Sequence, residues 1–264
     1  MRLDWGLRRS GGEAAQNLNM NFAFGRPRLL VPQKFSVSRR LFTRMNGTTW
    51  SVEKAIPEEL KEQIRRAKDQ QDTTLAFLSF LNILRSLKTT KRTGWLNFNV
   101  ENPESIADHM YRMGIISMMT QNVQVESAKC VKMALVHDMA EALVGDITPE
   151  DPVTKEDKHA REASTIEYIR DLLEPFNSKA AQELYTLWHE YENLSSPEAR
   201  FVKDVDKFEL LVQTLEEERR YKGEKDLSRF IGVRKQIQTP EVCKWADMVL
   251  AQRDEFWKSV TKLS

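Results

Sequence analysis

Cysteine is scarce in this sequence of 264 residues, and long apolar runs are missing. The two cysteines, Cys130 and Cys243, cannot build a disulfide framework or a cysteine-based zinc finger. No apolar stretch approaches the length of about 18 residues that a membrane-spanning helix needs, and the mean hydropathy is −0.54. These absences favour an intracellular protein of a reducing compartment that has no membrane partner.

Acidic residues are nearly absent from the first 52 positions. Residues 1–52 hold nine Lys or Arg but only Asp4 and Glu13 as acids, and they show no helical period. This composition is typical of an organellar transit peptide, so we expect a disordered segment that directs the protein to the chloroplast or the mitochondrion. The alternative is a disordered basic tail without a targeting function, on a protein of the cytoplasm.

The rest of the chain has an excess of acid. The whole sequence carries 40 basic and 39 acidic residues, which leaves 31 basic against 37 acidic residues in 53–264. Proteins that bind nucleic-acid polymers need clustered positive charge, so this balance argues against that class. The length suffices for one hydrophobic core, and we predict a single domain over residues 53–264.

Apolar residues recur at steps of three and four residues, the period of amphipathic helices. Such stripes cover 77–87, 106–123, 128–143, 163–173, 181–191, 201–215 and 242–257. Pro-Glu pairs at 57, 103, 197 and 240 predict helix starts, with Asn102, Ser196 and Thr239 as N-caps. The pattern predicts an all-α fold, a bundle of about seven or eight helices.

Histidine and carboxylate side chains gather along three of these stripes. His137, Asp138 and Glu141 share one face of the predicted helix 128–143, while His109 and Asp206 lie on other predicted helices. Buried ionised groups are costly unless they are paired or bind metal. Two imidazoles and two carboxylates suit a divalent ion and leave positions open for water and substrate.

Two longer motifs make the chain resemble a known family. Residues 92–109 (RTGWLNFNVENPESIADH) and 137–149 (HDMAEALVGDITP) resemble the signature motifs of the HD-domain 5'-deoxynucleotidases. Residues 187–192 and 202–206 extend the likeness, which covers roughly 72–220. It is nearest the eukaryotic branch typified by HD domain-containing protein 2.

The resemblance implies an HD-domain bundle that hydrolyses deoxyribonucleoside 5'-monophosphates to the deoxyribonucleoside and phosphate. It also implies a divalent cofactor, Mn²⁺ or Co²⁺ foremost, with Mg²⁺, Fe²⁺, Zn²⁺ or Cu²⁺ as alternatives. A homodimer is implied as well, for which Trp245, Val249 and Phe256 offer a surface. The implied metal ligands are His109, His137, Asp138 and Asp206.

Four further residues receive roles from the same resemblance. Glu141 and Asp146 are the catalytic carboxylates, and the sequence does not decide which is acid and which is base. Arg92 binds the substrate phosphate and stabilises charge in the transition state. Trp95 is placed at the sugar edge where a ribose 2'-hydroxyl would lie. Plainer interpretations remain: Arg92 as a solvated basic residue, Trp95 as core and Asp146 as a turn residue.

Two other functions stay open at this point. One is a different HD-type phosphohydrolase, acting on a cyclic nucleotide, a nucleoside triphosphate or an alarmone. The other is a non-catalytic nucleotide-sensing module, which the complete set of ligands disfavours.

Overall fold

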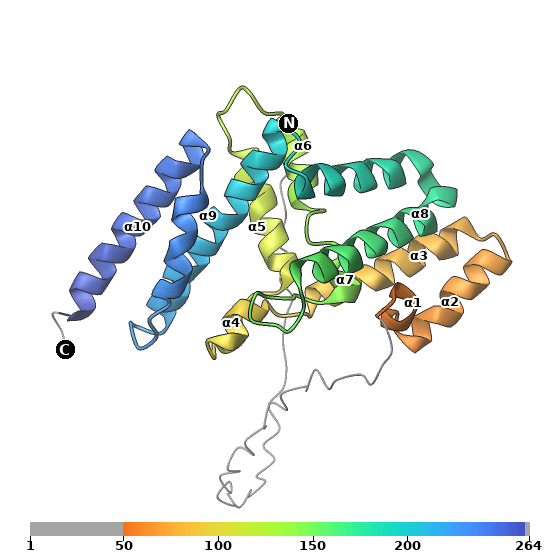
Figure 1. The fold of residues 1–264 in the computed structure, drawn as a ribbon, viewed down its shortest axis with the longest axis horizontal. Helices are drawn as coiled ribbons and strands as arrows, with labels where there is room; N and C mark the ends of the chain where they lie inside the picture. Colours follow the sequence, from red (N-terminus) through yellow and green to blue (C-terminus); the bar gives the residue numbers. More distant parts are fainter. Residues whose placement is uncertain (1–49, 262–264) are drawn as a thin grey trace, which may run out of the picture. The chain divides into compact units, whose positions relative to one another are not determined.

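The computed structural model describes residues 50–261, and this part of the chain is helical (Figure 1). It holds no strand, only an isolated bridge between Lys91 and Ser105. The elements are α1 (Val52–Ala55), α2 (Glu58–Asp69), α3 (Thr73–Leu84), η1 (Arg85–Lys88), α4 (Thr93–Asn97), α5 (Ile106–Met118), α6 (Ser127–Ala134), α7 (Glu141–Val144), α8 (Lys155–Glu192), α9 (Pro197–Arg220), η2 (Ser228–Gln236) and α10 (Pro240–Thr261), where η marks a 3₁₀ helix.

The predicted all-α fold is confirmed. Seven described α-helices have eight residues or more, or eight when the kinked α8 is counted as two. The predicted transit segment, residues 1–52, lies outside the described residues except at 50–52. No helix of the described part is long and apolar enough to cross a membrane.

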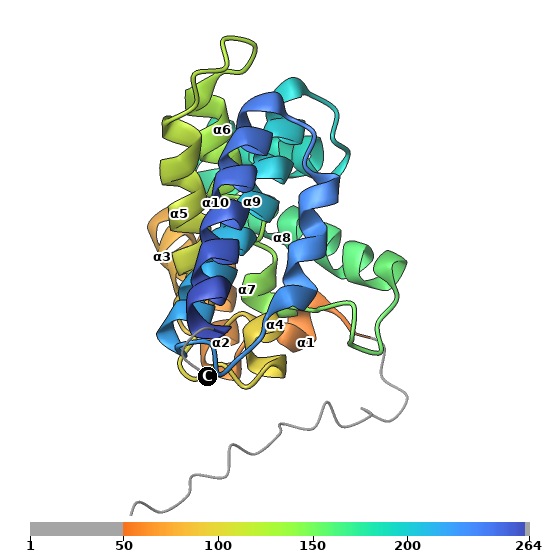
Figure 2. The same cartoon turned by 90° about the vertical axis from the view of Figure 1, so that its left-hand side faces the viewer.

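Two large clusters of buried apolar side chains hold most of the helices together, and a third, small one contains Trp95, Val100 and Leu227. One large cluster joins α2, α3, α7 and α8, and the other joins α5, α6, α9 and α10. The two groups lie on opposite sides in Figure 1, and Figure 2 shows α10 lying along α9. Helix α5 contributes Met110 to the first cluster and Met113 to the second. Met118 and Met119, at the C-terminal end of α5, are exposed and belong to neither cluster.

Helix α5 begins later than the Pro-Glu pair at 103 predicts. The segment 103–105 is extended, because the Arg92 amide donates to the Glu104 carbonyl (3.2 Å) and pairs the two segments. The helix starts directly after Ser105, whose side chain forms a reciprocal capping box with Asp108. This pairing brings the segment that carries Arg92 next to the start of α5.

The predicted helix 128–143 is broken in the middle. α6 ends at Ala134, and residues 135–140 form successive tight turns before α7 begins at Glu141. The Ala134 carbonyl accepts a hydrogen bond from His137 Nδ1 (2.9 Å). A side-chain donor thus takes the carbonyl that a continuing helix would offer to the Asp138 amide. His137 and Asp138 therefore lie on a turn rather than on a helix face.

The predicted helices 163–173 and 181–191 are two segments of one bent element, α8. Pro175 lies inside it, and Asn177 has non-helical dihedral angles (φ −155°, ψ 85°). Proline removes a helix donor and kinks the chain. The Asn177 side chain then accepts from the Ala180 amide (3.0 Å) as the cap of the second segment.

The dimer surface expected on α10 is partly used within the chain. Trp245 and Val249 pack against the cluster between α5, α6, α9 and α10, and Phe256 is half-buried. Trp245 and Val249 thus help to hold α10 against its neighbours.

Candidate active site

Two imidazoles from different elements face each other at the centre of the domain. His109 comes from α5 and His137 from the turn after α6, with ring centroids 5.5 Å apart. His137 Nδ1 bonds the Ala134 carbonyl, and His109 Nδ1 lies 2.7 Å from Glu209 Oε2. Because these oxygens accept, each Nδ1 carries the hydrogen. Both Nε2 atoms are buried and have no hydrogen-bond partner among the described residues.

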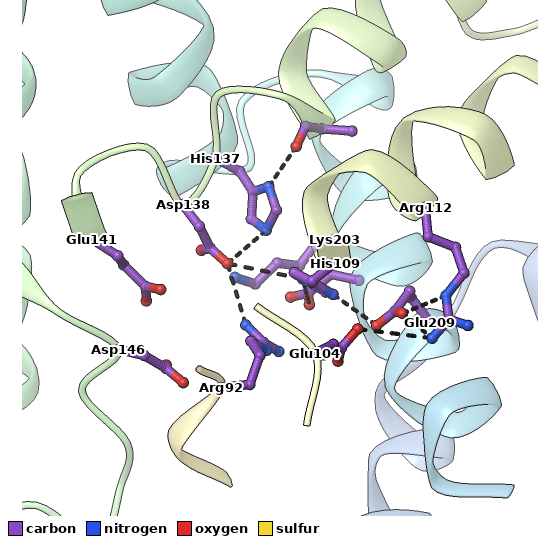
Figure 3. A network of polar contacts seen from close by, with 12 residues as sticks. Arg92, Glu104, His109, Arg112, His137, Asp138, Glu141, Asp146, Lys203 and Glu209 are labelled. Carbon is purple, nitrogen blue, oxygen red and sulfur yellow. Dashed lines mark hydrogen bonds and ion pairs between the residues drawn. The ribbon is translucent and has the colours of Figure 1, made fainter. Parts of the chain in front are cut away.

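Two carboxylates lie beside these nitrogen atoms. Asp138 Oδ2 is 3.1 Å from His137 Nε2 and 3.8 Å from His109 Nε2. Asp206 Oδ1, from α9, is 3.4 Å from His109 Nε2. Figure 3 shows the Asp138 carboxylate between the two imidazoles and Arg92. The structure therefore brings together all four predicted ligands, and buried nitrogen atoms without partners fit a bound divalent ion.

The charges at this point favour a cation. Burial by itself would raise the pKa of Asp138. The neighbouring His137 and Arg92 lower it by a larger amount, so the pKa lies well below its ordinary value. The pKa of Asp206 is likewise lowered despite burial, chiefly through His109. Burial and Arg92 lower the pKa of His109, while Glu209 and Asp206 outweigh them and raise it to about 10. A proton or a metal ion is thus stabilised among these groups.

Arg92 points into the same site from the residue before α4. Its Nη1 lies 3.3 Å from Asp138 Oδ2, and 16% of its side chain is exposed. Burial by itself would lower the pKa of the Arg92 guanidinium. The carboxylates of Asp138 and Asp146 raise it by a larger amount, so Arg92 stays charged. The plainer interpretation, a solvated basic residue, is wrong for Arg92.

Glu141 and Asp146 lie at the two ends of α7 and differ in their contacts. Glu141 is 3% exposed, and its Oε2 has no hydrogen-bond partner within residues 50–261. Burial, followed by Asp138 and Asp146, raises its pKa well above the ordinary value. One Asp146 oxygen accepts from the Thr93 amide (2.5 Å), so this side chain ties its loop to α4. Asp146 is therefore at least a structural residue.

A cavity of about 530 Å³ opens onto these groups. Trp95 lines it but is only 1% exposed, with Nε1 donating to Glu104 Oε1 (2.9 Å) and its ring against Phe230. Trp95 is thus both a core residue and part of the wall. The other predicted residues that line the cavity are Arg92, His137, Asp138, Glu141, Asp146 and Asp206.

Sequence reasoning missed two linked polar side chains, of which the first contacts predicted ligands and the second contacts the first. The Tyr191 hydroxyl donates to Asp206 Oδ2 (3.2 Å), and its ring lies 5.0 Å from that of His137. Lys203 Nζ, one turn before Asp206, donates to the same hydroxyl (3.1 Å). Neither residue has a spacing that separates it from an ordinary helix residue, and only the fold brings them to the ligands.

A second group of potential metal ligands, Glu104, His109 and Glu209, also has donor atoms close to one another. The Arg112 guanidinium lies against it, with Nε donating to Glu209 Oε1 (2.7 Å) and Nη2 lying 3.9 Å from Glu104. The Arg112 guanidinium therefore already neutralises this group. The candidate metal centre is the group on the cavity side of His109.

A comparison with protein families matches the HD domain to residues 84–244. This chain belongs to the HD domain family. The cluster of His109, His137 and Asp138, with donor atoms within 4.8 Å of one another, agrees with the divalent-metal dependence of HD domains.

Relatives with known names match most of the chain. The 5'-deoxynucleotidase hdd1 of Schizosaccharomyces pombe is 51% identical over 188 residues, which is 71% of this chain and 95% of that protein. The 5'-deoxynucleotidase YBR242W of Saccharomyces cerevisiae is 44% identical over 216 residues, 81% of this chain and 89% of that protein. Among solved structures, the HD domain-containing protein YGK1 matches with a TM-score of 0.63 and 36% sequence identity. The match covers 79% of this chain and 100% of the YGK1 chain.

Proposed function

We propose that this protein hydrolyses deoxyribonucleoside 5'-monophosphates to the deoxyribonucleoside and inorganic phosphate, with a divalent metal ion as cofactor. The observation that carries the proposal is the pair of buried Nε2 atoms of His109 and His137, which face Asp138 and Asp206 beside a cavity that Arg92 also enters. The two relatives at 51% and 44% identity are named 5'-deoxynucleotidases, which supports the substrate class.

The four ligand side chains would hold the ion, which supplies Lewis acidity and activates water when bound. Arg92 binds the phosphate oxygens, since a guanidinium can bond two of them in a planar fork. Asp138, 3.3 Å from Arg92 Nη1, holds that guanidinium in the site before substrate arrives. The neighbouring carboxylates repel a phosphate dianion, so the metal ion and Arg92 are both needed for the dianion to bind.

We assign the proton-transfer role to Glu141. Its Oε2 is buried without a partner, whereas an Asp146 oxygen is occupied by the Thr93 amide. Burial raises the pKa of Glu141 above its ordinary value, and a carboxyl group whose proton is held more tightly in this way is suited to protonate the leaving 5'-oxygen. Asp146 orients the segment that carries Arg92.

Trp95 is the proposed sugar wall. It is 1% exposed, lines the cavity and is held by Glu104 and Phe230, so it cannot easily move aside. A rigid Trp95 ring excludes a ribose 2'-hydroxyl because the two groups would overlap sterically. It does not need to deprive the ribonucleotide of a hydrogen bond. We expect Trp95→Ala to lower the ratio of kcat/KM between deoxyribo- and ribonucleotides, while Trp95→Phe keeps most of the preference.

The reaction is tested with metal-free protein. Phosphate release from deoxyribo- and ribonucleoside 5'-monophosphates is assayed after adding Mn²⁺, Co²⁺, Mg²⁺ or Zn²⁺, with His137→Ala as control. We expect metal-dependent release from the deoxy series, foremost with Mn²⁺ or Co²⁺, and none from the control. No phosphate release from any monophosphate, together with chromatographic conversion of a cyclic nucleotide to its monophosphate, or of a triphosphate or an alarmone to its dephosphorylated product, would favour another HD-type reaction.

Glu141→Gln tests the proton-transfer role, and turnover by the wild-type protein separates an enzyme from a sensing module. The amide cannot transfer the proton but keeps the shape, so turnover should fall by at least about 100-fold while metal binding is retained. Undiminished turnover would remove Glu141 from the mechanism. Nucleotide binding without turnover in the wild-type protein would favour the sensing module.

A homodimer is a further part of this proposal. Tyr111, Ile115 and Met118 recur one turn apart on α5, and they are 67%, 42% and 54% exposed. Such an apolar stripe is typical of a protein interface. We expect sedimentation to give a dimer at micromolar concentration and Tyr111→Glu to give a monomer; a wild-type monomer would refute it.

The location of the protein is also proposed from composition alone. The basic, acid-poor residues 1–52 would direct a fused fluorescent reporter to the chloroplast or the mitochondrion. A reporter that stays in the cytoplasm would support the basic-tail alternative.

A further inference from the structure

Glu209 is a completely buried carboxylate behind His109. It follows Asp206 by three residues on α9, so one helix face carries both. Its exposed fraction is 0%, and each of its oxygen atoms has its own partner. Oε2 lies 2.7 Å from His109 Nδ1, and Oε1 accepts from Arg112 Nε (2.7 Å). Figure 3 shows Glu209 on the side of His109 that faces away from Asp138.

The same helix offers a matched comparison. Glu218 is also 0% exposed and pairs with an arginine of a neighbouring helix, Arg253 of α10 (2.7 Å). Its remaining partners are the Leu227 amide and the Trp257 indole, none of which lines the cavity. Glu209 differs in one respect, because its partner is an imidazole whose other nitrogen faces the carboxylates of the site.

We propose that Glu209 is a positioning residue for the metal centre. Its carboxylate accepts the Nδ1 hydrogen of His109, which fixes the tautomer that leaves Nε2 free and fixes the direction in which the ring points. A carboxylate at Nδ1 also increases the electron density of the imidazole and so strengthens its bond to a cation. The inference rests on the metal site of the proposed function and on no property of the nucleotide.

Arg112 holds Glu209 in this position. Its guanidinium, from α5, is bonded in turn to Gln213 and to Glu216 (2.6 Å), the next two turns of α9. The network therefore spans the two helices that supply His109 and Asp206. Because Arg112 keeps the buried Glu209 carboxylate from rotating, the His109 imidazole bonded to that carboxylate is held in one orientation.

The test measures metal affinity rather than turnover. Full-length metal-free protein is titrated with Mn²⁺ and Co²⁺ by calorimetry, and thermal unfolding is followed in the same samples without metal. Glu209→Gln removes the charge but keeps the shape, and we expect metal binding about 10- to 100-fold weaker than in the wild type. Glu218→Gln should lower the melting temperature and leave the metal affinity unchanged.

Two results would overturn the role of Glu209. One is unchanged metal affinity in Glu209→Gln; the other is an equal loss in Glu218→Gln, which would make the effect one of general stability. Should Glu209→Gln fail to fold, Glu209→Asp keeps the charge beside Arg112 but shortens the side chain and withdraws the carboxylate from His109 Nδ1, and unchanged affinity there also refutes the proposal. A wild-type protein that binds neither ion would instead refute the metal site itself.

Discussion

Glu162, on the α8 wall of the cavity, shows how burial controls a single carboxylate. Its side chain is 12% exposed, and burial raises its pKa to about 7 although Lys158 opposes the change. Its pKa in the unfolded chain is near 4.5, so the folded state binds the proton more tightly. The stabilisation from this group is complete below about pH 4.5 and is lost as the pH rises through about 7.

Glu162→Gln should remove this pH dependence. The free energy of unfolding of the variant, relative to the wild type, should rise between pH 5 and pH 8 by at most about 3 kcal/mol. Urea unfolding of metal-free protein at a series of pH values measures the difference. Parallel curves for the two proteins would show that Glu162 does not change its protonation in this range.

At the scale of elements, the loop after α7 depends on Gly145. This residue has φ +82° and ψ 166°, a conformation essentially restricted to glycine. It ends α7 and places Asp146, whose carboxylate accepts from the Thr93 amide at the start of α4. The link between the loop and the Arg92 segment therefore needs a residue without a side chain at 145.

Gly145→Ala should lower the free energy of unfolding by about 1–3 kcal/mol. A Cβ there would meet no atom within 4 Å, so the cost is backbone strain alone. Because the strained loop carries Asp146, we also expect a lower kcat/KM. Gly232→Ala is the control, since Gly232 has equal space around it and no positive φ. Equal stability in both variants would contradict the argument.

At the scale of the whole molecule, the metal should stabilise the fold. Asp138 and Asp206 are partly buried carboxylates with lowered pKa values that belong to different elements, so a shared cation would link α9 to the turn after α6. Free metal at 100 times its Kd adds about 2.7 kcal/mol, or about 5 to 10 °C in melting temperature for a domain of this size.

Thermal unfolding with chelator and with added Mn²⁺ checks this expectation. The wild type should melt at a higher temperature with metal, and His137→Ala should lose most of the difference. A wild-type melting temperature that ignores metal, or an equal shift in the variant, would show that the ion does not join these elements.

The sequence by itself determined the helical class and predicted which polar residues are candidates for the site. Apolar stripes at three- and four-residue steps predicted most of the helical segments, because burial of one face depends on local spacing. Local chemistry also set the cap at Ser196, which accepts from the Ala199 amide (3.0 Å) as predicted. Charged side chains such as Asp138 and Asp206, within apolar stripes, indicated a site because their burial needs a cation.

Tertiary structure decided where those helices break and what surrounds the ligands. The break after Ala134 follows from a side-chain hydrogen bond of His137, and the late start of α5 follows from pairing with the Arg92 segment. Glu209 occupies a core position, four residues after the buried Val205, so in the sequence its acidity in an apolar stripe was the only signal. Its partner lies 100 residues away, and a contact over that separation exists only once α5 and α9 have packed.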